Sequence, residues 1–284
     1  MTTSETPSGA PAPTAGRAGR NLPAAIASGV VLVAVIIASL LLWKPAFVLV
    51  VTVAILLGVW ELRAALLTKD IAIPFEPLVI GAVVMLLGAY VGGAPALVTA
   101  LAVTALGSML WRLRGGVAGF VRDATAGVFT AVYVPFLAGF VLLLLKPEDG
   151  HLRVLTFIAV TIASDIGGYV VGVLAGKHPM APVISPKKSW EGFVGSTVFC
   201  VLAGWLLVVH LLDGRWWVGV LLGVVAVVMA TLGDLCESVI KRDLGIKDMS
   251  AIIPGHGGLM DRLDSLLATV APTWLILFYL VPVG

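Results

Sequence analysis

Nine apolar stretches in this 284-residue chain are each close to the length of a helix that crosses a lipid bilayer, about 20 residues. Backbone groups inside lipid must bond within their own segment, so such stretches fold as helices and not as open strands. The chain is 60% hydrophobic and 12% charged, whereas about a quarter of a soluble domain is charged. The sequence therefore predicts an all-α, polytopic integral membrane bundle of about nine transmembrane helices, over residues 23–43, 46–66, 76–92, 95–111, 124–145, 154–175, 193–212, 216–240 and 266–283.

The Lys and Arg residues are divided unequally between the two alternating sets of loops. If the N-terminus is cytoplasmic, 14 of the 18 fall on the cytoplasmic side, and the other four are Lys44, Lys146, Arg153 and Arg215. Cytoplasmic loops carry an excess of basic residues, so we expect the N-terminus inside and the C-terminus outside. We predict a disordered cytoplasmic tail over residues 1–22, an N-terminal transmembrane bundle over 23–150 and a catalytic transmembrane region over 151–284.

The most polar stretch, Ser238–Asp264, holds four carboxylates, four cationic side chains and a histidine within 27 residues. Just before it, Asp234 and Glu237 share one helix face with Ser238 and Lys241, because the four are three or four residues apart. A carboxylate near the end of a membrane helix is costly unless it is paired, hydrated or bound to a metal. The two carboxylates therefore either pair with Lys241 at the headgroup level or belong to a functional site.

Two further carboxylates, Asp261 and Asp264, lie where the ninth span begins. They either cap that helix, whose N-terminus favours negative charge, or join Asp234 in binding Mg²⁺. This ion takes few carboxylates and completes its coordination with substrate phosphates. Asp165, in the sixth span, is expected to face the bundle interior or a water-filled cavity, because an unpaired charge in lipid is penalised.

A second polar cluster lies at residues 177–192. Lys187 and Lys188, with Lys177, can neutralise a triphosphate or a lipid phosphate. The alternative is that they anchor the topology or contact anionic lipids. Glycines at residues 167, 168, 172 and 176 indicate close packing of helices rather than a phosphate loop.

Two acidic residues at span edges, Glu61 and Asp123, lie beside Arg63 and Arg122 and are interpreted as interfacial ion pairs. The sequence contains no GxxxxGK[ST], HExxH or GxSxG motif, so no familiar soluble-enzyme chemistry competes. An ion-coupled transporter that uses the intramembrane carboxylates is an alternative. It would spread polar residues through several spans, whereas here they gather toward one membrane face, which favours an enzyme.

At these residues the sequence resembles the phosphatidate cytidylyltransferase (CDP-diacylglycerol synthase) family. Residues 233–238 match its G-D-x-x-E-S, and residues 185–192 match its S-P-K-K-[ST]-W-E-G. DIGGY at residues 165–169 resembles its D-[TS]-[GA]-A-Y, with departures at Ile166 and Gly168. The resemblance covers about residues 160–265, and the fixed residues of the family's long signature are met at Ser238, Lys241, Arg242, Lys247, Asp248, Pro254, His256, Gly257, Gly258, Asp261, Arg262 and Asp264.

The resemblance implies transfer of the cytidylyl group of CTP to phosphatidate, giving CDP-diacylglycerol and pyrophosphate, in phospholipid biosynthesis. It implies Mg²⁺ as the cofactor, with a second metal ion as an alternative. The expected metal ligands are Asp234 and Asp261, supported by Asp165, Glu237 and Asp264. Catalytic roles are expected for Lys241, Arg242, Lys247, Asp248, His256 and Arg262, and substrate binding for Ser185, Lys187, Lys188 and Ser238.

The resemblance also implies a multi-pass protein of the cell inner (plasma) membrane whose active site faces the cytoplasm. The expected partners are CTP, phosphatidate, membrane lipids and a second copy of the chain in a homodimer, with no nucleic acid. A CTP-dependent enzyme that acts on another lipid stays open as an alternative.

Overall fold

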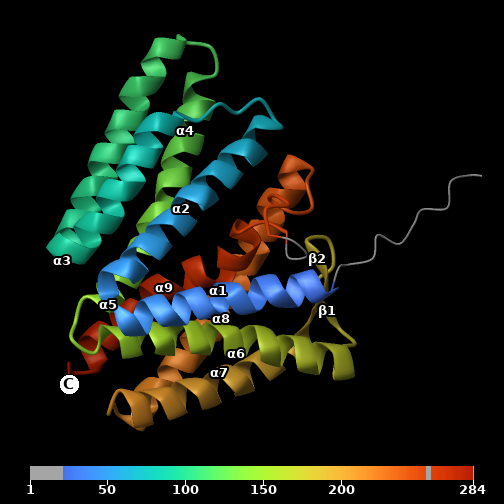
Figure 1. Cartoon of the computed structure of the whole chain (residues 1–284). Helices are drawn as coiled ribbons and strands as arrows, with labels where there is room; N and C mark the ends of the chain where they lie inside the picture. The colour runs from blue at the N-terminus through green and yellow to red at the C-terminus, as the bar shows by residue number, and fades with distance from the viewer. Residues whose placement is uncertain (1–21, 254–256, 284) are drawn as a thin grey trace, which may run out of the picture.

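The computed structural model describes residues 22–253 and 257–283. Residues 1–21 of the predicted disordered tail lie outside the described residues, and so does His256. The described chain is helical apart from loops and one short hairpin of strands, which confirms the all-α prediction. The long helices are α1 (Leu22–Leu42), α2 (Lys44–Leu67), α3 (Phe75–Arg112), α4 (Phe120–Ala131), α5 (Leu137–Leu145), α6 (Gly150–Ala175), α7 (Trp190–Leu211), α8 (Trp216–Leu244) and α9 (Met260–Leu280) (Figure 1).

Helix α3 is a hairpin of two helical arms and not one straight rod. Gly93 has φ 75° and ψ −161°, a backbone conformation that glycine tolerates and helices exclude. A Cβ atom on Gly81 would lie 2.2 Å from the Thr104 side chain, although 23 residues of straight helix would span about 35 Å. The predicted spans 76–92 and 95–111 are therefore the two arms of this hairpin.

Seven segments are long and apolar enough to cross a membrane when the α3 hairpin is counted once, and α1 adds a shorter apolar helix over Ala27–Leu42. One of the seven, Phe120–Leu145, joins α4 to α5 through a π-helical turn at Val132–Phe136. Counting the two hairpin arms separately and adding α1 gives nine apolar helices, which agrees with the nine predicted spans. The predicted boundary at residue 150 falls where α6 begins, and the division into two regions stays a prediction.

The loops after α1 and α5 and the turn within the α3 hairpin meet at one end of the bundle. Lys44 donates to the Pro147 carbonyl at 2.5 Å, and Lys146 donates to the Val91 carbonyl at 3.0 Å. At the other end Asp123 binds Arg112 at 2.9 Å and accepts from the Ala72 backbone at 3.2 Å, which joins the loops after α2 and α3. The segregation is what alternating transmembrane spans require.

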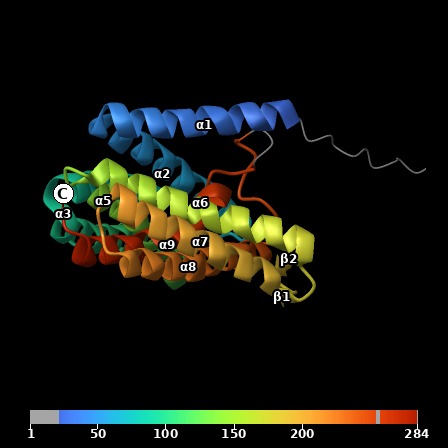
Figure 2. The ribbon, with the colours of Figure 1, turned by 90° about the horizontal axis from the view of Figure 1, so that it is seen from below.

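The C-terminal helices pack closely at glycines. A Cβ atom on Gly167 of α6 would lie 2.7 Å from the Gly195 carbonyl oxygen of α7, and one on Gly195 would lie 2.6 Å from the Gly167 carbonyl oxygen. Such close approach of helix backbones is typical of membrane bundles. The glycine-rich run in the sixth span is thus confirmed as a packing surface, and Figure 2 shows α6 to α9 stacked together, with α1 along one edge.

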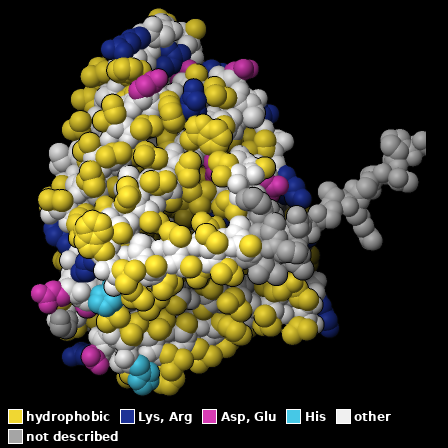
Figure 3. Space-filling view, in the orientation of Figure 1, with side chains coloured by type: hydrophobic (Ala, Val, Ile, Leu, Met, Phe, Trp, Pro, Cys, Tyr) yellow, Lys and Arg dark blue, Asp and Glu magenta, His cyan; other side chains and the backbone are white. Residues whose placement is uncertain are grey.

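Hydrophobic side chains cover the middle of the face shown in Figure 3, whereas most Lys, Arg, Asp and Glu side chains lie near its margins. Exposed Val, Leu and Trp side chains occur on most of the long helices. A soluble protein rarely exposes so large an apolar surface. This surface fits lipid contact, and the polar site described next lies at one end of it.

Candidate active site

A polar cavity of about 260 Å³ lies among α6, the hairpin of strands, α7, α8 and α9. Five of the residues predicted to belong to the site line it, although they come from three stretches spread over 70 residues of sequence. These five are Asp165, Ser185, Lys187, Lys188 and Asp234. Side chains not predicted from the sequence complete the polar lining, namely Ser164, Tyr169, Ser189, Ser196, Thr231 and Ser265.

The lysines reach the cavity from a hairpin of two short strands. Strand β1 (Pro179–Ala181) pairs with antiparallel β2 (Ser185–Ser189). Ser189 then caps α7 by accepting from the Gly192 backbone at 3.1 Å. The hairpin therefore places Lys187 and Lys188 directly before the N-terminus of α7, where Lys188 reaches Asp234 of α8.

The four residues predicted to share a face of α8 do so. Ser238 donates to Asp234 at 3.3 Å, and Lys241 binds Glu237 at 2.6 Å. Asp234 binds Lys188 of the hairpin at 2.6 Å. The pairing with Lys241 that the sequence left open is thus correct for Glu237, whereas Asp234 turns toward the cavity.

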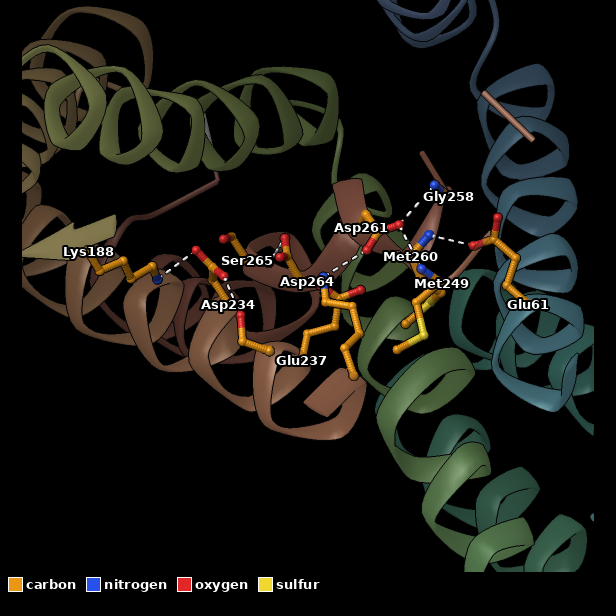
Figure 4. Close-up of polar contacts among 12 residues, drawn as sticks. Glu61, Lys188, Asp234, Glu237, Met249, Gly258, Met260, Asp261, Asp264 and Ser265 are labelled. Atoms are coloured by element: carbon orange, nitrogen blue, oxygen red, sulfur yellow. Dashed lines mark hydrogen bonds and ion pairs between the residues drawn. The ribbon is translucent and has the colours of Figure 1, made fainter. Parts of the chain in front are cut away.

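Asp261 binds the loop that precedes it as well as a cation. Its Oδ1 accepts from Lys241 at 2.7 Å, and its Oδ2 accepts from the backbone N–H groups of Met249 at 3.0 Å and Gly258 at 2.8 Å. A Cβ atom on Gly258 would lie 2.9 Å from Oδ2 and 2.9 Å from the Ser250 nitrogen, so this turn requires glycine. In the view of Figure 4, Glu237 and Asp264 lie between Asp234 and Asp261.

The acidic side chains fit a hard cation that takes most of its ligands from a substrate. Glu237 is completely buried, and its Oε1 has no hydrogen-bond partner among the described residues. Asp165 and Asp234 line the cavity next door. No group of three His, Cys, Asp or Glu side chains within residues 22–253 and 257–283 is placed to hold a metal by itself. Mg²⁺ binds through one or two carboxylates plus phosphates, so the set suits Mg²⁺ in the presence of substrate.

Four residues with expected catalytic roles lie on the surface near this end of the bundle. Arg242, Lys247, Asp248 and Arg262 are exposed and are not among the described residues that line the cavity. His256 lies outside the described residues. The catalytic roles, like the metal-binding roles, stay predictions.

One sequence interpretation is wrong. Glu61 does not pair with Arg63, whose guanidinium lies over the Phe75 ring at 4.7 Å from its centroid. Glu61 is instead fully buried and accepts from the backbone of Leu259 and Met260, about 200 residues away. A carboxylate inside an apolar span was the signal for such a partner.

The companion interpretation is confirmed. Asp123 binds Arg122 at 3.0 Å and also binds Arg112 at 2.9 Å. Asp123 is buried while the Arg122 side chain is half-exposed. Together with Arg112, the pair joins the end of α3 to the first turn of α4.

An apolar helical bundle with lysines and carboxylates gathered in a cavity at one end is the arrangement of a membrane protein that acts on polar, charged substrates at a membrane face. The model of the cytidylyltransferase family matches residues 23–280, and the chain belongs to this family. It is thus a membrane-embedded nucleotidyltransferase.

Relatives support this assignment over nearly the whole length. The chain is 43% identical over 278 residues to a phosphatidate cytidylyltransferase of Mycobacterium leprae (strain TN), covering 92% of this chain and 89% of the relative. It is 42% identical over 280 residues to one of Mycobacterium bovis, covering 94% and 92%. A phosphatidate cytidylyltransferase of Haemophilus influenzae is 39% identical over 147 residues, covering 48% and 51%.

Proposed function

We propose that the chain transfers the cytidylyl group of CTP to phosphatidate and releases CDP-diacylglycerol and pyrophosphate. The observation that carries the proposal is the cavity where Lys187 and Lys188 meet Asp165 and Asp234 at the end of an apolar bundle. Relatives of 42% and 43% identity that span the chain bear the name phosphatidate cytidylyltransferase.

The main obstacle in this reaction is the repulsion between two anionic phosphates. A phosphate oxygen of phosphatidate attacks the α-phosphorus of CTP, a new P–O bond forms, and the bond to the β-phosphate bridging oxygen breaks. The phosphate is already an anion near neutral pH, so no side-chain nucleophile or general base is needed. Lys187 and Lys188 neutralise phosphate oxygens in the cavity, and Asp234 orients Lys188 through their 2.6 Å contact.

Mg²⁺ is the cofactor that this donor set would hold, through Asp234 and Asp165 at the cavity, with Glu237 and Asp264 beside them. When bound, Mg²⁺ supplies positive charge to the reacting phosphates and the departing pyrophosphate. Asp261, whose two oxygens already bind Lys241 and two backbone amides, holds the loop in place before substrate arrives.

The proposal includes the cell inner membrane as the location and the cytoplasm as the side of the cavity, where CTP is available. The cavity lies at the end of the bundle that collects the basic loops, which supports this orientation. A homodimer is part of the same proposal and follows from the family resemblance. Membership of a nucleotidyltransferase family favours this enzyme over the transporter alternative.

The test incubates the purified protein with CTP and phosphatidate, with and without a chelator of divalent cations. We expect CDP-diacylglycerol to form only when both substrates and Mg²⁺ are present. An enzyme for another lipid would leave phosphatidate unused while converting an ether-lipid phosphate or a polyprenyl phosphate. That result would overturn the substrate assignment.

A further inference from the structure

The fully buried carboxylate of Glu61 lies on α2, far in sequence from every residue of the cavity. Its Oε1 accepts from the Ser250 hydroxyl at 2.5 Å and the Leu259 backbone at 2.9 Å, and its Oε2 accepts from the Met260 backbone at 2.7 Å. Figure 4 shows Glu61 reaching this loop from the side opposite Lys188. Both oxygens are thus used by one loop and the helix that follows it.

The contact supplies a cap that α9 lacks locally. The first N–H groups of a helix have no partner within the helix, and Leu259, which precedes α9, has no side-chain acceptor. A carboxylate at this end is favoured both as a hydrogen-bond acceptor and by the helix dipole. On α2, one turn before Glu61, a Cβ atom on Gly58 would lie 3.0 Å from the Met260 sulfur, so the glycine lets α9 seat against α2.

Glu61 and Asp261 clamp the same two stretches of chain. Each accepts hydrogen bonds from residues 249–250, within the loop that follows α8, and from residues 258–260, where this loop leads into α9. Asp261 also binds Lys241, which binds Glu237 beside the cavity. A shift of the α9 N-terminus would therefore move Asp261 and the cation bound to it.

We propose that Glu61 is a positioning residue for cytidylyl transfer. By capping α9 from α2, it holds Asp261 and Lys241 in register with the cavity while making no contact with substrate itself. The proposal rests on the proposed function, because the reaction supplies one of its two readouts.

The first readout is the kinetics of full-length Glu61→Gln and Glu61→Asp proteins. Gln replaces one acceptor oxygen by an NH₂ group, which then faces a backbone N–H donor. A misplacement of about 1 Å can cost about a hundredfold in rate, so we expect kcat of Glu61→Gln to fall by about ten- to a hundredfold. The KM for CTP should change by less than about threefold, because substrate contacts stay in place. Glu61→Asp, which keeps both oxygens, should recover part of kcat.

The second readout is tryptic cleavage after Lys247, an exposed residue in the clamped loop. Losing a hydrogen bond to a charged group shifts the equilibrium between the closed and the locally opened loop by about a factor of ten or more. Cleavage should therefore accelerate about tenfold in Glu61→Gln. Glu76→Gln, at an exposed carboxylate in the first turn of α3, is the matched control and should leave both readouts unchanged.

Wild-type kcat per folded molecule in Glu61→Gln, with or without faster cleavage, would overturn the proposal. If this variant does not fold, Ser250→Ala removes one of the three donors. It should then show smaller changes of the same sign, and unchanged values would overturn the proposal equally. A wild-type protein that makes no CDP-diacylglycerol would sink the proposed function, whereas the cleavage rates would still show whether Glu61 clamps the loop.

Discussion

Asp234 and Asp261 have the same type of side chain but bind different partners. Asp234 faces the cavity and binds Lys188, while Asp261 binds Lys241 and two backbone amides. The side chain of Asp234 is 36% exposed and that of Asp261 is 6% exposed. Asp234 is therefore the more accessible of the two carboxylates and lies at the cavity, whereas Asp261 is occupied by its contacts with Lys241 and the loop.

Replacing Asp234 by Asn removes its charge at nearly constant volume. We expect kcat/KM for CTP to fall about a hundredfold or more, the usual size of losing one electrostatic group in an active site. Asp213→Asn, at an exposed turn on the opposite end of the bundle, is the matched control, since Asn also tolerates the φ of 48° there. Full activity of Asp234→Asn in membranes would remove the role assigned to this carboxylate.

The two lysines of the hairpin should differ in importance. Lys188 binds Asp234 at 2.6 Å, whereas Lys187 is an exposed member of the cavity wall. Lys188→Gln should raise the KM for CTP about tenfold, because a charge-assisted contact is lost, and Lys187→Gln should raise it less. Steady-state assays over a range of CTP concentrations measure both. Wild-type kinetics in both variants would mean that the pair only anchors the topology.

At the scale of helices, the close contact between α6 and α7 sets where the cavity walls lie. Gly195 faces the Val171 side chain, to which a Cβ atom would approach within 2.5 Å, and the Gly167 carbonyl oxygen at 2.6 Å. Ser164 and Ser196, joined by a 2.6 Å hydrogen bond from the Ser196 hydroxyl to the Ser164 carbonyl, line the cavity from these same helices. Any separation of α6 from α7 would therefore alter the site.

Gly195→Ala should destabilise the bundle by about 1–3 kcal/mol, the usual penalty of overpacking a tight contact. Gly107→Ala is the control, because a Cβ atom there meets nothing within 4 Å. Alanine improves helix propensity, so the control should be neutral or slightly stabilising. Thermal unfolding in detergent measures both, and equal melting temperatures would contradict the packing described for α6 and α7.

Periodic and local features of these elements could be predicted from the sequence. The apolar spans follow from length and hydropathy, and the shared face of α8 follows from the three- and four-residue spacing of its polar side chains. The hairpin of strands at residues 179–189 was missed, because its strands have three and five residues and carry no run of β-branched side chains.

The partners of the site residues could not be predicted in the same way. Glu61 binds residues 189 to 199 positions away, and no local pattern records which distant donor a buried carboxylate will meet. Arg63, the neighbour that the sequence offered, prefers the Phe75 ring. Lys188 likewise meets Asp234 only because α7 and α8 pack together, a consequence of glycines at their contact.

At the scale of the whole molecule, the loops after α1 and α5 and the turn of the α3 hairpin meet at one end of the bundle, and the loops after α2 and α3 meet at the other. Val183, in the hairpin beside the cavity, and Glu148, after α5, are exposed at opposite ends. In a background with Cys200 and Cys236 replaced by Ala, an impermeant thiol reagent added to intact cells should label Glu148→Cys and spare Val183→Cys. Inverted membrane vesicles should give the reverse. Labelling of both variants from one side would contradict the orientation.

The central claim is that the cavity joins the α-phosphate of CTP to a lipid phosphate, and the fate of each phosphate of CTP tests it most directly. The purified protein is incubated with phosphatidate, Mg²⁺ and CTP carrying radiolabel at either the α- or the γ-phosphate. We expect the α-label to appear in the lipid fraction as CDP-diacylglycerol and the γ-label to stay in water as pyrophosphate. Transfer of the γ-label to lipid, or of neither label, would contradict it.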